Sequence, residues 1–161
     1  MGGLGFGDAA ARELGKRVAQ LEELQRLLLI LQGEIRCVRL TLPAVCELLA
    51  KDAKAPFQQF FWKVSEDLGK RTGQTAGEIW SRNLKEIQKL LFLTKKEQQD
   101  LEEFGQLLGR MDMPMQLSAI QFYQEKIMLS LAEAKAAADS RQKLYRYLGA
   151  LGGAALVLVI M

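Results

Sequence analysis

Apolar residues recur at steps of three, four or seven along most of the chain, and this spacing predicts α-helices. The first series implies one helix of about 30 residues, roughly 45 Å long. Its members are Leu14, Val18, Leu21, Leu28, Leu31, Ile35, Val38 and Leu42. A second series keeps heptad spacing near the other end of the chain. Its members are Met113, Leu117, Ile120, Gln124, Ile127, Leu131, Ala134 and Ala138.

Two short helices are predicted directly after the first long one. Pro43 fits the first turn of a helix over residues 42–53, and Pro56 opens another over residues 56–70. The apolar face of the second comprises Phe57, Phe60, Phe61, Val64 and Leu68. No stretch alternates apolar and polar residues in the way a β-strand does.

Two further short helices begin at Thr-x-x-Glu capping boxes, which start at Thr75 and Thr94. We expect the later helix to end at Gly109 in a left-handed conformation, and Asp112 to cap the second long helix. The fold class is therefore all-α, a bundle of about six helices.

The two long helices are expected to pack antiparallel, so that their free ends lie together. Leu28, Leu31 and Ile35 should meet residues 120–131, whereas Leu24 lies off this stripe and should matter less. The short helices would then form a tip roughly 40 Å from the free ends.

Residues 147–161 are apolar throughout, and no stop signal separates them from the second long helix. They supply fewer residues than the roughly 20 of a full membrane span, and a buried core helix is the alternative. A basic flank, with Tyr145 and Tyr147 as an aromatic belt, favours a C-terminal transmembrane helix with its basic side cytoplasmic. Gly149 and Gly153 have the Gly-x-x-x-Gly spacing that is found where membrane helices pack against each other.

The composition excludes most catalytic designs. Hydrophobic residues make up 49% of the chain and charged residues 25%, which is ordinary for a folded protein. The absence of histidine excludes imidazole chemistry, Ser-His-Asp and Cys-His triads, and His-ligated metals. The net charge of +3 is small and dispersed, and indicates no nucleic-acid binding. We expect no enzyme activity, cofactor, metal or small-molecule substrate.

Cysteine and tryptophan residues favour structural roles. Cys37 and Cys46 lack the further ligands of a zinc site, so buried free thiols are expected. Trp62 and Trp80 lie in apolar stripes and are interpreted as core anchors. Trp80 is also a candidate partner-binding residue, because exposed tryptophans often dominate interfaces.

Four local patterns together resemble the stage III sporulation protein AB family of endospore-forming bacteria. They cover most of the chain from about residue 20. The most specific pattern comprises Phe104, Gly105, Leu108, Gly109, Asp112 and Gln116. The weaker ones are Gln32-x-Glu34-Ile35 with Thr41-Leu42-Pro43, then Glu78-x-Trp80, then Lys143-x-Tyr145-x-x-Leu148-Gly149.

The resemblance implies a non-enzymatic scaffold of the secretion-like channel between mother cell and forespore, required for sporulation. The family's cytoplasmic bundle looks like the inner-membrane platform protein of type II secretion systems. Implied partners are other stage III membrane subunits and a cytoplasmic ATPase. Lys95, Lys96 and Arg110 are candidates for docking that ATPase on the tip, whereas the motif residues also have purely structural interpretations.

The resemblance also bears on domain organisation. The family usually begins with a transmembrane helix, whereas residues 1–10 form a glycine-rich stub, which we interpret as the remnant of such a helix or as the start of a single-anchored member. Residues 11–146 would be the cytoplasmic bundle in the mother cell, and residues 147–161 the membrane segment, with the C-terminus on the far side. The alternative function is a tail-anchored adaptor that binds an amphipathic partner helix.

Overall fold

The computed structural model describes residues 2–37, 41–110 and 113–160, and within them it is helical without a strand. The elements are α1 (Gly2–Cys37), α2 (Leu42–Asp52), α3 (Phe57–Gly69), α4 (Ala76–Ile87), a short 3-10 helix η1 (Gln88–Leu90), α5 (Lys95–Arg110) and α6 (Met113–Ile160). The all-α prediction is confirmed, with the 3-10 turn as an element that the sequence pattern did not indicate. The glycine-rich stub is helical from Gly2 and continuous with α1.

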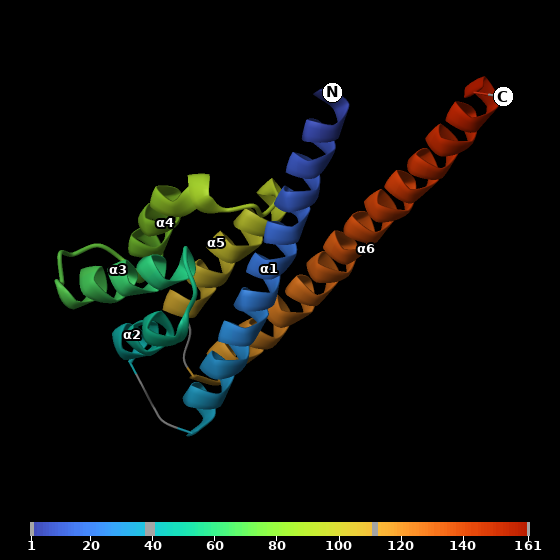
Figure 1. Ribbon diagram of the computed structural model, residues 1–161. Coiled ribbons are helices and arrows are strands. Elements are labelled where there is room, and N and C mark those ends of the chain that lie inside the picture. Colours follow the sequence, from blue (N-terminus) through green and yellow to red (C-terminus); the bar gives the residue numbers. More distant parts are fainter. Residues whose placement is uncertain (1, 38–40, 111–112, 161) are drawn as a thin grey trace.

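The long helices α1 and α6 pack antiparallel, and both termini lie at the same end of the molecule (Figure 1). Glu22 pairs with Lys135 at 3.6 Å, whereas Gln32 accepts a hydrogen bond from Gln124 at 3.4 Å. This register places the buried stripe of α1 opposite residues 120–131, as predicted. Beyond the bundle the two helices diverge toward the termini (Figure 1).

Leu24 belongs to the core, contrary to the expectation that it lies off the main stripe. It is 3% exposed and Leu31 is 2% exposed, so the two leucines are equally buried. The reason is that α1 is covered by α6 on one side and by short helices on the other. Its buried face is therefore wider than a heptad seam.

The short helices lie side by side along the flank of α1 and do not form a separate tip beyond it (Figure 1). In chain order α2 packs on α3, α3 on α4, α4 on α5 and α5 on α6, while α2 also contacts α1. Each short helix has one apolar face, and this arrangement buries those faces against one another and against the long pair.

The predicted starts of α2, α4 and α5 are confirmed, whereas α1 begins at Gly2, well before the expected start near Leu14. Thr75 Oγ1 accepts a hydrogen bond from the Glu78 N–H at 3.1 Å. Thr94 and Glu97 form a complete capping box, in which each side chain accepts from the other residue's N–H, at 3.2 and 3.0 Å. Pro43 occupies the first turn of α2. Asp112 lies outside the described residues, so its capping role stays a prediction.

Gly109 does not end α5, because the helix continues to Arg110. A Cβ at Gly109 would lie 2.9 Å from the Cβ of Ala76 at the start of α4. The prediction of a left-handed helix end is wrong, and the glycine instead permits α4 and α5 to approach closely.

The end of α6 leaves the bundle as a single continuous helix (Figure 1). Leu144, Tyr147, Leu148 and Leu151 are more than half exposed, and a Cβ at Gly149 or Gly153 would meet no atom. These residues are not a core helix. The side chain of Tyr145 lies outside the described part. No helix among the described residues combines the length and hydropathy of a membrane-crossing segment.

Candidate functional site

Trp80 is the centre of the contact between α3, α4 and α5. It is 2% exposed, and its Nε1–H donates to the Leu101 carbonyl at 3.1 Å. The ring lies edge-on to Phe60 at 4.8 Å and to Phe104 at 6.1 Å between centroids. Trp80 is therefore the core anchor that its apolar stripe indicates. Its ring is covered, so the proposed partner-binding surface at Trp80 does not exist in this conformation.

The most specific sequence motif forms the packing between α5 and its neighbours. Phe104 stacks on Tyr123 of α6 with centroids 4.7 Å apart and planes 14° from parallel. Gly105 lies directly under the Trp80 indole, where a Cβ would overlap the ring. Leu108 is buried, and its carbonyl accepts a hydrogen bond from Gln116 Nε2 at 3.0 Å. Gln116 thus satisfies a carbonyl in the last turn of α5, which lacks a helical partner.

Sequence reasoning missed Gln106, which joins α4 to α5. Its Nε2 donates to the Gly77 carbonyl at 2.9 Å and to Ser81 Oγ at 2.8 Å. A Cβ at Gly77 would overlap the Gln106 side chain. The glycine inside the first capping box was the available signal, because a glycine in a helix interior often marks a close approach.

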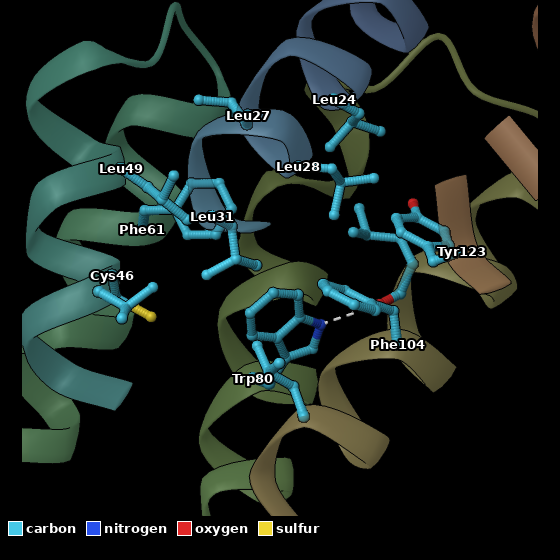
Figure 2. A pocket seen from close by; sticks show the side chains of 13 residues that line it. Leu24, Leu27, Leu28, Leu31, Cys46, Leu49, Phe61, Trp80, Phe104 and Tyr123 are labelled. Carbon is cyan, nitrogen blue, oxygen red and sulfur yellow. Dashed lines mark hydrogen bonds between the residues drawn. The ribbon is translucent and has the colours of Figure 1, made fainter. Parts of the chain in front are cut away.

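A small apolar cavity of about 20 Å³ lies at the centre of the bundle. Its lining comes from α1, α2, α3, α4, α5 and α6, and Figure 2 shows Leu24, Leu28, Phe104 and Tyr123 facing it. The space is no larger than one water molecule and its walls are apolar, so it holds no substrate. Burial raises the pKa of the Cys46 thiol at its edge to about 12. Cys46 therefore stays protonated and is a packing residue, as expected.

A buried ion pair joins α1 to the start of α5. Arg17 contacts Glu97 through two hydrogen bonds, Nε to Oε1 at 3.0 Å and Nη2 to Oε2 at 2.6 Å. Burial opposes ionisation of Glu97, but hydrogen bonds from Arg17 and from the Thr94 N–H outweigh it and lower its pKa. The pair is two-pronged and largely shielded from water, so it fixes the position of α5 on α1.

A second buried polar group ties α3 to α4. Asp67 accepts hydrogen bonds from Asn83 Nδ2 at 3.1 Å and Arg82 Nη2 at 2.9 Å, and the bond from Asn83 is the main reason that its pKa is lowered. The hydrogen bonds of Asp67, like those of Glu97, therefore connect helices of the bundle with one another. Among the described residues, no group of acidic or sulfur side chains is arranged to bind a metal.

The candidate ATPase-docking residues lie at the two ends of α5. Lys95 and Lys96 are exposed at the start of α5, beside the middle of α1. Arg110 is the last residue of α5, about 22 Å away at the helical rise, and its side chain lies outside the described part. The lysines and Arg110 therefore lie at opposite ends of α5 and not together on one tip, and a docking surface that includes all three would have to span the length of that helix.

Trp62 is the tryptophan that reaches the surface. Its side chain is 47% exposed, so its interpretation as a core anchor is wrong. It lines a shallow groove on α2 and α3 together with Ala50, Lys51, Gln58 and Gln59. In α3 the residues Phe57, Phe60, Phe61 and Val64 already fill the buried face, which turns position 62 outward.

Comparison with known proteins identifies the family. The sequence profile of stage III sporulation protein AB matches residues 1–161. Stage III sporulation protein AB of Bacillus subtilis (strain 168) is 30% identical over 146 residues, which cover 91% of this chain and 85% of that protein. The chain belongs to the stage III sporulation protein AB family.

The solved structure of a stage III sporulation protein AB has the same fold. It superposes with a TM-score of 0.69 at 28% identity, over 77% of this chain and 97% of that chain. Neither the family nor these relatives carry the name of an enzyme. In this member, Phe104, Gly105, Leu108, Gly109 and Gln116 of the most specific motif pack or form hydrogen bonds within the bundle. Leu148 and Gly149 of the last pattern are exposed on the projecting end of α6.

Proposed function

We propose that the protein is a membrane-attached, non-enzymatic platform in the sporulation machinery, part of the secretion-like channel between mother cell and forespore. Membership of the stage III sporulation protein AB family supports a role in sporulation. The Arg17–Glu97 and Asp67–Arg82 pairs fix neighbouring helices of the bundle relative to one another, and such a rigid body is suited to holding other proteins in place. The bulk of the chain would lie in the mother-cell cytoplasm, with the C-terminus across the membrane.

The observation that carries the proposal is the last part of α6. Past the bundle, the apolar side chains that the structure describes on α6 are exposed, and Leu148 and Leu151 are 55% and 67% exposed. Leaving a leucine side chain exposed to water, instead of burying it fully, costs roughly 1.5–3 kcal/mol. Lipid or the helices of other membrane subunits would cover them.

The test is fractionation of sporulating cells that carry Leu148→Asp together with Leu151→Asp in the full chain. We expect the wild-type protein in the membrane fraction and the variant displaced from it, with reduced spore formation. The control substitution Leu29→Asp, at an exposed position within the bundle, should leave the protein in the membrane fraction. Equal membrane recovery of the wild type and the tail variant would contradict attachment through α6.

The partners we propose are the other stage III membrane subunits and a cytoplasmic ATPase. Because the end of α5 at Arg110 is remote from the projecting termini, it is the better candidate for the ATPase (Figure 1). Arg110→Glu should weaken pull-down of the ATPase without changing the unfolding temperature. Undiminished pull-down would exclude this end of α5.

A second candidate function is a tail-anchored adaptor that binds an amphipathic partner helix. The groove beside exposed Trp62 favours it, since tryptophan is a frequent interface anchor. Trp62→Ala would then abolish capture of the partner while the fold and the membrane attachment persist. If Trp62→Ala cells form spores normally, the adaptor function is excluded.

A further inference from the structure

Lysines gather where α4 ends and α5 begins. Lys85, Lys89, Lys95 and Lys96 are all exposed, and Glu86 is the one carboxylate within residues 85–96. From α1, exposed Lys16 joins this group by placing its Nζ 4.8 Å from the centre of the Phe92 ring. We call residues 85–96 together with Lys16 the basic corner.

The basic corner also exposes apolar surface. Leu90, which follows Lys89 in the chain, is 49% exposed and lines a hollow with Lys16, and Phe92 is half-buried beneath Lys16. Basic side chains around an exposed leucine are typical of surfaces that rest at a membrane interface. There the long lysine stems follow the apolar layer and their amines reach the headgroups.

The basic corner is fixed to α1. Gln20 of α1 forms two hydrogen bonds to its backbone. Its Nε2 donates to the Leu90 carbonyl at 3.0 Å, and its Oε1 accepts from the Phe92 N–H at 2.7 Å. The Arg17–Glu97 pair holds the following turn of α5 in the same way. The direction in which the corner faces is therefore set by the direction of α1.

That direction coincides with the side on which the chain ends. In Figure 1 the connection from α4 to α5 is the part of the short-helix group nearest the two termini, and the exposed apolar end of α6 projects toward the same side. A membrane holding the end of α6 would thus face the basic corner.

We propose that the basic corner contacts the headgroups of an anionic lipid membrane. This inference rests on the proposed attachment of α6 to the same membrane. Each lysine near such a surface strengthens binding about fivefold, and the effect is lost within a Debye length. The corner would fix the tilt of the bundle over the bilayer and leave the opposite end of α5 free for a protein partner.

The experiment is flotation of the purified full chain with vesicles of phosphatidylcholine alone or of phosphatidylcholine with phosphatidylglycerol. The corner variant carries Lys89→Gln, Lys95→Gln and Lys96→Gln. The matched control removes three exposed positive charges elsewhere, through Lys51→Gln, Lys63→Gln and Lys70→Gln. Circular dichroism establishes that all three proteins are equally helical.

We expect the wild type and the control to prefer the anionic vesicles, and the corner variant to lose about tenfold to a hundredfold of its binding to them. High salt should remove the difference, whereas binding to neutral vesicles should be equal for all three proteins. Equal binding of the corner variant and the wild type to anionic vesicles would overturn the proposal and leave the attachment of α6 standing.

Two other results are informative about the source of binding. If nothing binds neutral vesicles but the corner variant still loses binding to anionic ones, the corner is supported and attachment through α6 fails. If the corner variant binds anionic vesicles normally but no longer captures the ATPase, the lysines serve a protein partner and the lipid proposal is overturned.

Discussion

Gly105 has no room for a side chain, because a Cβ would overlap the Trp80 indole. We expect Gly105→Ala to destabilise the protein by about 1–3 kcal/mol through overpacking between α4 and α5. Gly33→Ala is the matched control, since a Cβ there meets no atom and alanine favours the helix by up to ~1 kcal/mol. Denaturant unfolding measures both. Equal effects at the two glycines would mean that the close approach at Trp80 is not tight.

Leu24 and Leu31 both line the central cavity and are equally buried. We therefore expect Leu24→Ala and Leu31→Ala each to cost about 2–5 kcal/mol, because each would enlarge an existing void. Leu29→Ala, at a 60% exposed position on the same helix, should cost far less. If denaturant unfolding shows a markedly smaller loss of stability for Leu24→Ala than for Leu31→Ala, the buried face of α1 is the narrower heptad stripe.

Residue roles could be predicted from the sequence only where local spacing determines them. The burial of Leu31 and Trp80 follows from helical periodicity alone. The exposure of Trp62 also follows from spacing, because Phe57, Phe60, Phe61 and Val64 already occupy the buried face of α3. The burial of Leu24 depends on which elements pack on each side of α1, which spacing does not encode. The role of Gly109 is not encoded locally either, because its neighbour Ala76 lies on another helix.

At the scale of elements, helix boundaries were predictable because the capping residues act within one turn. Thr75 and Thr94 begin their helices through hydrogen bonds to residues three positions later. The candidate docking surface failed at this scale. The length of α5 is predicted to within one residue, but the sequence does not encode its position along the flank of α1. The expected tip brings Lys95 and Arg110 together, whereas in the structure they lie at opposite ends of α5.

The junction of α1 and α5 depends on the Arg17–Glu97 pair. We expect Glu97→Gln to cost about 1.5–3 kcal/mol at neutral pH, since it leaves the Arg17 guanidinium without its charged partner. Arg17→Met together with Glu97→Gln should cost less than the sum of the two single substitutions. Additive losses in the double-mutant cycle would mean that the two side chains do not interact.

The same pair makes stability depend on pH. Folding lowers the Glu97 pKa below its ordinary value of 4.5, so the folded state favours the ionised form. This contribution is fully present above about pH 4.5 and is lost as the pH falls through the lower folded-state value. Unfolding free energies of the wild type and Glu97→Gln should therefore converge in acid. A constant difference down to low pH would contradict the assignment.

At the scale of the whole molecule, α6 combines a part that packs inside the bundle with a part that projects beyond it. The bundle buries α6 as far as Ala134, and beyond Ala138 its described side chains are exposed. The antiparallel pairing was predictable, since two heptad helices at opposite ends of a chain bring their free ends together. The lateral placement of the short helices was not, because any arrangement that buries their apolar faces satisfies the pattern.

Because residues 146–151 are exposed and add no burial to the bundle, the chain without residues 147–161 should remain folded. We expect its unfolding temperature to stay within a few degrees of the full chain's, since surface changes are typically worth under about 0.5 kcal/mol. Helical circular dichroism should fall only by the share of the removed residues. A truncated chain that aggregates or loses helicity beyond that share would show that the end of α6 stabilises the bundle, and attachment through it would then need another explanation.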